Sequence, residues 1–101
     1  MIFMVTQQYP YNKGNEMAEK FLQAIKTPLP PAIKKWQTFS TIKGDMIKVY
    51  NLIMTEKDKG DAAQMHIMKI LGPFGEVDGY LVKTELVFGA RDAFEAIGRP
   101  L

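Results

Sequence analysis

An α+β fold is predicted from the order of elements along the chain: strand, helix, strand, strand, helix, strand, and then a short helical tail. Three patterns give this order. A strand–turn–strand stretch lies between Ile33 and Met54, two stretches show helical apolar spacing, and a strand-like run stands near each end. Two helices on one face of a four-stranded antiparallel sheet, with a short C-terminal helix, is the natural packing of this order, in a single domain over residues 1–101.

The central hairpin consists of IKKWQTFSTI and MIKVYNLIM around Lys43-Gly44-Asp45. Two registers are open. A three-residue loop from Lys43 to Asp45 places Ile42 opposite Met46, whereas a two-residue Lys43-Gly44 loop exchanges the faces of one strand relative to the other. We favour the first register because it separates an apolar side from a mixed side. The apolar side then holds Ile33, Phe39, Ile47, Val49 and Ile53. The mixed side holds Trp36, Thr38, Ser40, Ile42, Met46, Lys48, Tyr50 and Leu52.

The segments before the hairpin predict one strand and one helix. IFMVTQQY alternates as a strand should, and Pro10 ends it. Asn12 or Asn15 is a suitable cap for a helix whose apolar face holds Met17, Phe21, Ala24 and Ile25. The run Pro28-Leu29-Pro30-Pro31 then predicts a stiff, extended connection into the hairpin.

The segments after the hairpin predict a second helix, a strand and the tail. Asp61 is a candidate N-cap, and Gly72-Pro73 stops the helix. Its apolar stripe holds Ala63, Ile67, Ile70, Leu71 and Phe74. YLVKTELVF predicts the final strand from Tyr80 to Phe88, and Ala90 to Ile97 the helical tail.

Composition excludes several classes of chemistry. The chain has no cysteine, so thiolate catalysis, thiolate metal sites and Fe–S clusters are excluded. The apolar start from Met1 to Val5 is too short for a signal-peptide core or a membrane span, and we expect a cytoplasmic protein. The net charge of +2 comes from scattered lysines, which favours a solvated surface over nucleic-acid or membrane binding.

The strands carry apolar residues on both sides, and two helices cover only one side of a sheet. The other side would expose more apolar surface than monomers usually do. We therefore expect a second copy of the chain to cover it in a two-fold homodimer. In element order the chain resembles the ferredoxin-like fold, and with a two-sided sheet it resembles the dimeric α/β-barrel superfamily, in which two such sheets pack face to face. The tail, with Phe94 and Ile97, would clasp the partner or close its own sheet edge.

Candidate catalytic residues are few. His66 is the only histidine and lies away from the predicted core stripe, as surface histidines do. The loop from Glu56 to Asp61 alternates acids with lysines and predicts no metal site, and no cofactor motif is present. The third strand, from Gly44 to Tyr50, lacks the aromatic signature of RNA-recognition modules.

The mixed side of the hairpin has the makeup of a small-molecule site, with aromatic walls, an adaptable lining and a few polar groups. The candidate ligand-binding residues are Trp36, Thr38, Lys48, Tyr50 and Leu52. One hypothesis is a protein that binds a small hydrophobic or aromatic molecule between packed sheets. A second is a cofactor-independent enzyme, since the resembled superfamily includes monooxygenases and isomerases, with Lys48, Tyr50 or His66 carrying protons. A third is a purely structural dimer module, in which these side chains fill the core.

Overall fold

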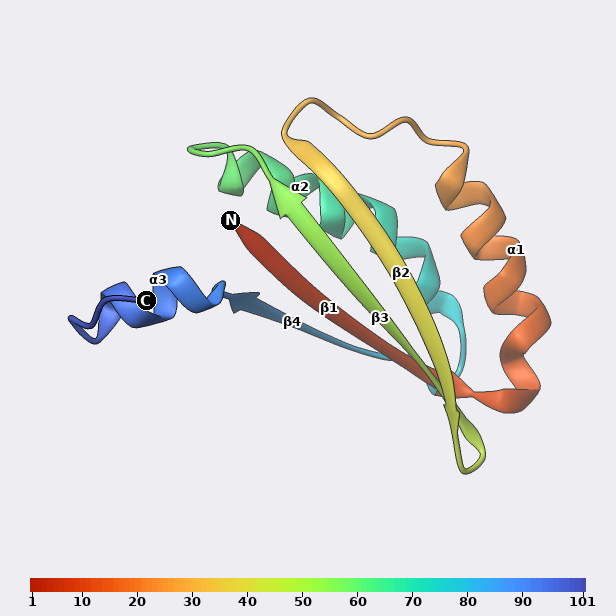
Figure 1. Cartoon of the computed structure of the whole chain (residues 1–101). Coiled ribbons are helices and arrows are strands. Elements are labelled where there is room, and N and C mark those ends of the chain that lie inside the picture. The colour runs from red at the N-terminus through yellow and green to blue at the C-terminus, as the bar shows by residue number, and fades with distance from the viewer.

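A computed structural model describes residues 1–101 and contains one four-stranded antiparallel sheet in the order β2-β3-β1-β4. The strands are β1 (Ile2–Pro10), β2 (Ile33–Lys43), β3 (Met46–Thr55) and β4 (Leu81–Val87). The helices are α1 (Gly14–Ile25), α2 (Gly60–Leu71) and α3 (Ala90–Ala96), with short 3-10 segments η1 (Tyr11–Lys13) and η2 (Gly72–Glu76). Both α1 and α2 lie on one side of the sheet (Figure 1). The predicted ferredoxin-like α+β fold is confirmed.

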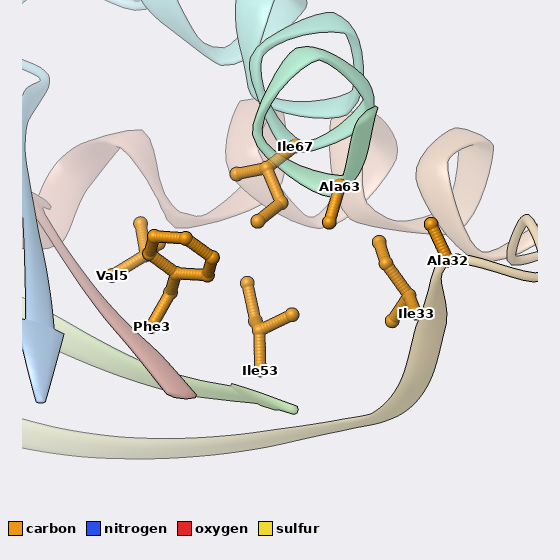
Figure 2. Packing of buried hydrophobic residues seen from close by; sticks show 7 residues of the cluster. All are labelled: Phe3, Val5, Ala32, Ile33, Ile53, Ala63 and Ile67. Carbon is orange, nitrogen blue, oxygen red and sulfur yellow. The ribbon is translucent and has the colours of Figure 1, made fainter. Parts of the chain in front are cut away.

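The main core lies between α2 and the sheet. Alternate residues of β1 point toward the helices, so Phe3 and Val5 are buried while their neighbours are only partly covered. Ile53 of β3 is completely buried beside them, and Ala63 and Ile67 descend from α2 onto this layer (Figure 2). The cluster is completed by Ala32 and Ile33 at the start of β2. We call the side of the sheet that carries these residues the helix-facing side and the other side the open face.

A second, smaller cluster anchors the first half of α1. Met17 packs with Phe74 and Val77 from the segment after α2. One turn later, Lys20 Nζ lies 2.6 Å from a carboxylate oxygen of Glu76, and this ion pair lowers the pKa of Glu76. These contacts hold α1 to η2, and Tyr9 of β1 is partly buried against the same cluster.

The favoured hairpin register is wrong. Lys43 pairs with Met46 and Ile42 with Ile47, so the loop is the two residues Gly44 and Asp45. Gly44 has φ +66° at the first loop position, where type II′ hairpin turns place a glycine. The alternative Lys43-Gly44 loop assigns the residues of β2 and β3 to the correct faces of the sheet, but this loop begins one residue too early in the chain.

The error in the register has a physical cause. We favoured the pairing that made the helix-facing side uniformly apolar, but that side also carries polar side chains, which are hydrogen-bonded to one another as described below. Trp36 pairs with Ile53 and Thr38 with Asn51, so both β2 residues face the helices. Phe39, which was expected in the core, pairs with Tyr50 on the open face and is 56% exposed.

The predicted element limits agree closely with the structure, except at the helix caps. The final strand and the tail helix are shorter than predicted by one or two residues. Both α1 and α2 begin after a lysine, Lys13 and Lys59, and neither start has a side-chain cap. The expected caps at Asn12, Asn15 or Asp61 are therefore wrong. The predicted helix stop at Gly72-Pro73 is confirmed.

Much of the sheet surface lacks a covering layer. The apolar residues of the open face include Ile2, Met4, Phe39, Met46, Tyr50, Leu52, Met54, Leu81 and Val87. Helix α3 lies beyond the end of β4, apart from α1 and α2, and all of its residues are exposed (Figure 1). The radius of gyration is 15.2 Å, against about 13 Å for a compact chain of this length.

None of the helices has the length and apolar character needed to cross a membrane.

We predict that Ile53→Ala lowers the free energy of unfolding by about 2 to 5 kcal/mol, because the substitution leaves a cavity in the completely buried centre of the core. Urea denaturation would measure the change. Ile42→Ala is the matched control, since Ile42 lies on the same side of the adjacent strand but is 63% exposed. Equal losses in the two variants would contradict this description of the core.

Candidate functional site

A pocket of about 400 Å³ lies between α1 and the helix-facing side of the sheet. Its lining consists of Gln7, Phe21, Ala24, Ile25, Thr27, Leu29, Trp36, Thr38, Asn51, Ile70, Leu71 and Phe74. A smaller pocket of about 200 Å³ adjoins it and shares four of these residues, Gln7, Phe21, Thr38 and Phe74. Most of the lining is apolar, with polar groups on the sheet and at Thr27 after α1. This combination is typical of small-molecule sites.

The pocket lies beside the second half of α1, where Ala24 alone is packed against a core cluster. The other apolar side chains of this half, Phe21, Leu22 and Ile25, are exposed. Phe21 is 44% exposed and Ile25 is 61% exposed, although the sequence predicts both on a core-facing stripe. The extended proline-containing connection then brings Leu29 to the rim of the same pocket. The apolar face of α1 therefore forms a wall.

Asn51 is the centre of a hydrogen-bonded group on the pocket floor. Its Oδ1 accepts hydrogen bonds from Trp36 Nε1 and Thr38 Oγ1, both at 3.0 Å. Its Nδ2 donates to the backbone oxygen of Val5 at 3.1 Å and to Gln7 Oε1 at 2.9 Å. Gln7 Nε2 in turn donates to the hydroxyl of Tyr80 at 3.0 Å. This hydrogen-bonded group spans β2, β3 and β1 and ends at Tyr80, the residue before β4.

The direction of each bond follows from the chemistry of two groups. The indole N–H of Trp36 is only a donor, and the backbone carbonyl of Val5 is only an acceptor. The amide of Asn51 must therefore present its oxygen to Trp36 and its nitrogen to Val5. Gln7 must then accept from Asn51 and donate to Tyr80. Because Gln7 and Asn51 are only 4% and 3% exposed, this arrangement, in which every amide oxygen and nitrogen has at least one partner, avoids most of the cost of burying unpaired amides.

Tyr80 is held in place by a turn and by an aromatic contact. Gly79 has φ +82°, and a Cβ at this position would lie 2.7 Å from Cγ of Pro10, so the turn into Tyr80 requires glycine. The ring of Tyr80 stacks on Phe74 with centroids 6.2 Å apart. Burial raises the pKa of Tyr80, partly offset by the bond from Gln7, and burial also raises the pKa of Tyr9. Both phenols are therefore neutral at physiological pH.

The pocket lining contains no ionisable side chain. Its polar groups are two amides, two threonine hydroxyls and an indole N–H, which bind by hydrogen bonds but do not exchange protons readily near neutral pH. No group of three or more acidic or histidine side chains is arranged to hold a metal ion. The arrangement can orient a neutral molecule against an apolar wall.

The structure does not bring the five candidate ligand-binding residues together. Trp36 and Thr38 line the pocket on the helix-facing side. Lys48, Tyr50 and Leu52 lie on the open face, because the register places them on the side opposite Trp36.

Two floor residues, Gln7 and Asn51, were missed as site residues. The available signal was their position: each occupies an alternate place among buried residues, Gln7 after Phe3 and Val5, and Asn51 between Val49 and Ile53. An amide within such a series has to be hydrogen-bonded. The sequence does not show that its partners come from three other segments.

His66 lies away from this pocket. It is half-buried on α2, and it lines a depression beside the proline-containing connection with Asp58 and Asp61. Its Nε2 is buried and has no hydrogen-bond partner. His66 therefore contributes nothing to the pocket under α1.

Comparisons with known proteins show distant likeness. No protein family and no curated protein matches this chain. Among solved structures it is similar to the uncharacterised protein TM1266 of Thermotoga maritima, with 18% identity, a TM-score of 0.41, and coverage of 83% of this chain and 92% of that one. It is also similar to part of a formyltetrahydrofolate deformylase from Pseudomonas putida KT2440, with 7% identity, a TM-score of 0.43, and coverage of 86% and 29%.

A third similar structure is an aminopeptidase PepT from Bacillus cereus ATCC 10987, with 14% identity, a TM-score of 0.41, and coverage of 98% of this chain and 36% of that one. The chain thus spans nearly all of the Thermotoga protein but well under half of the two enzymes.

In an alkaline titration followed by tyrosinate absorbance, tyrosines with a raised pKa ionise in a late step, at higher pH than the others. We predict that Tyr80→Phe reduces the size of this late step. A raised pKa in the folded state means that the neutral phenol stabilises the fold below the ordinary value of 10.0, and that this stabilisation is lost as pH rises through the raised pKa. The variant should also have a lower urea midpoint at neutral pH, corresponding to a free energy of unfolding lower by about 1 to 3 kcal/mol, because Gln7 loses its acceptor.

Tyr11→Phe is the control for stability, because Tyr11 is 60% exposed and the substitution should leave the midpoint unchanged. An undiminished late step in Tyr80→Phe would contradict the assignment.

Proposed function

We propose that the protein binds a small, uncharged and mostly apolar molecule in the pocket under α1, without chemical conversion. The observation that carries this proposal is a pocket of about 400 Å³ whose apolar wall faces a floor of hydrogen-bonded amide, hydroxyl and indole groups. Apolar walls provide affinity through burial, and a few fixed polar groups set orientation. This volume lies within the range of small-ligand sites.

Binding is favoured over catalysis by the positions of the possible proton carriers. Lys48 and Tyr50 are on the open face, and His66 lines a separate depression on α2. None of the three lines the pocket. A general acid or base must come within hydrogen-bond reach of the reacting group, directly or through one water. A cofactor-independent monooxygenase or isomerase at this site has no support from its lining.

Filling the pocket should weaken ligand binding. We predict that Ala24→Phe weakens a hydrophobic probe such as 2-naphthol by about tenfold or more, because the new ring occupies the space between α1 and the floor. Trp36 is the only tryptophan and lines the pocket, so its indole N–H resonance reports occupancy.

Ala62→Phe is the matched control, since Ala62 is an exposed alanine on α2 that does not line the pocket. Unchanged affinity in a folded Ala24→Phe variant would place the binding elsewhere.

We also propose that a second copy of the chain covers the open face in a homodimer. On that face Phe39 is 56% exposed and stands opposite Tyr50, which is 36% exposed, while Leu81 is 62% exposed. Only 15 of the 101 residues are buried, which is a small core for a chain of this length. A self-complementary interface is the commonest way to cover such a surface.

The C-terminal arm supports the same proposal. Phe88 and Ile97, which flank α3, are 67% and 68% exposed, and Phe94 within it is 36% exposed, so the arm leaves much of its apolar surface uncovered on its own chain. In a homodimer, burial of these side chains against the partner would offset the cost of ordering the arm. The ligand was expected between packed sheets, whereas the pocket described above lies on the opposite side of the sheet. The ligand proposal and the dimer proposal are therefore independent of each other.

Two lysine substitutions on β2 test the dimer. We predict that the unmodified chain sediments as a dimer at tens of micromolar and that Phe39→Lys shifts it to monomer, because the charge would be buried in the interface. Ile42→Lys is the matched control, since Ile42 is 63% exposed on the other side of the same strand, and it should remain dimeric. A monomeric unmodified chain in analytical ultracentrifugation would rule the dimer out.

A further inference from the structure

We infer that the ligand carries one neutral group that both accepts and donates a hydrogen bond, namely a hydroxyl or a carboxamide, attached to an apolar body. This inference rests on the proposed binding function and names the chemistry of its ligand. It follows from the hydrogen-bonding capacity that remains on the pocket floor after the internal bonds have been made.

The side chains of Asn51 and Trp36 have no free hydrogen-bond donor or acceptor for a ligand. The two N–H groups of the Asn51 amide are used by Val5 and Gln7, and its oxygen accepts two bonds. The single indole N–H of Trp36 is used as well. These two residues therefore hold the floor rigid, and the exposed ring surface of Trp36 acts as an apolar wall.

Gln7 and Thr38 retain free hydrogen-bonding capacity, and the oxygen of each can still accept a bond. Gln7 Nε2 has two hydrogens and uses one for Tyr80, so a second donor is free. Thr38 donates its only hydroxyl hydrogen to Asn51, so its oxygen is left as an acceptor. Both residues line the larger and the smaller pocket. A ligand group that pairs the free N–H of Gln7 and the oxygen of Thr38 must accept from the first and donate to the second.

Two other ligand classes fit this floor less well. A carboxylate or ammonium would be buried against a lining without any opposite charge, which is costly. A wholly apolar ligand would cover the free N–H of Gln7 without giving it an acceptor, which is also unfavourable. A hydroxyl or carboxamide supplies the acceptor and the donor together and carries no charge.

Three probes of similar shape separate these classes: 2-naphthol, 2-methylnaphthalene and 2-naphthoate. Each is titrated into the full chain at neutral pH, and affinity is followed through the Trp36 indole N–H resonance. We expect 2-naphthol to bind at least about fivefold more tightly than 2-methylnaphthalene, although the latter is the more hydrophobic, because it gains the hydrogen bonds described above. We expect 2-naphthoate to bind more weakly than 2-naphthol.

Thr38→Val tests the acceptor directly. It should reduce the affinity for 2-naphthol about fivefold and leave 2-methylnaphthalene unchanged, because only the hydroxyl oxygen is removed while Trp36 still bonds to Asn51. Thr41→Val makes the same change in the same strand on the open face and should alter neither affinity. An unchanged preference for 2-naphthol in Thr38→Val would overturn the inference.

The outcomes distinguish this inference from the proposal beneath it. If 2-methylnaphthalene or 2-naphthoate binds at Trp36 as tightly as 2-naphthol, the pocket proposal stands and the neutral donor–acceptor group is ruled out. If none of the three probes binds, the pocket proposal itself is overturned and this inference falls with it.

Discussion

The side-chain amide of Asn51 is the constraint on which the rest of the site depends. It lies in the middle of the sheet, 3% exposed, and its four hydrogen bonds join three strands on the side that packs against the helices. A buried amide is tolerated only when its capacity is met, and each partner left without its bond would cost about 1 to 3 kcal/mol. The position of Trp36 and the orientation of Gln7 both follow from satisfying this one group.

The anchoring of α1 determines how much of that floor is covered. Met17 and Lys20 attach the first half of the helix to the segment after α2, whereas in the second half only Ala24 packs against the same cluster. Phe21 and Ile25 therefore line a pocket and are not buried in a core. A helix packed along its whole length would have covered the polar groups of β2 and left no space for a ligand.

The two sides of the sheet present different problems. On the helix-facing side, polar side chains lie within an apolar layer and are satisfied by one another. On the open face, Phe39, Tyr50 and Leu81 meet no layer at all. The ligand proposal is based on the first side and the dimer proposal on the second, which is why each has its own experiment.

The sequence alone determined the element order and the fold class, because strand alternation, helical spacing and the Gly72-Pro73 stop are local signals. It also determined that the sheet has apolar residues on both sides. Only the tertiary structure decided the hairpin register, since Gly44 permits more than one loop and a one-residue shift exchanges the faces. The site likewise depends on contacts between residues distant in sequence, such as Gln7 with Tyr80 and Asn51 with Val5, and no local pattern encodes them.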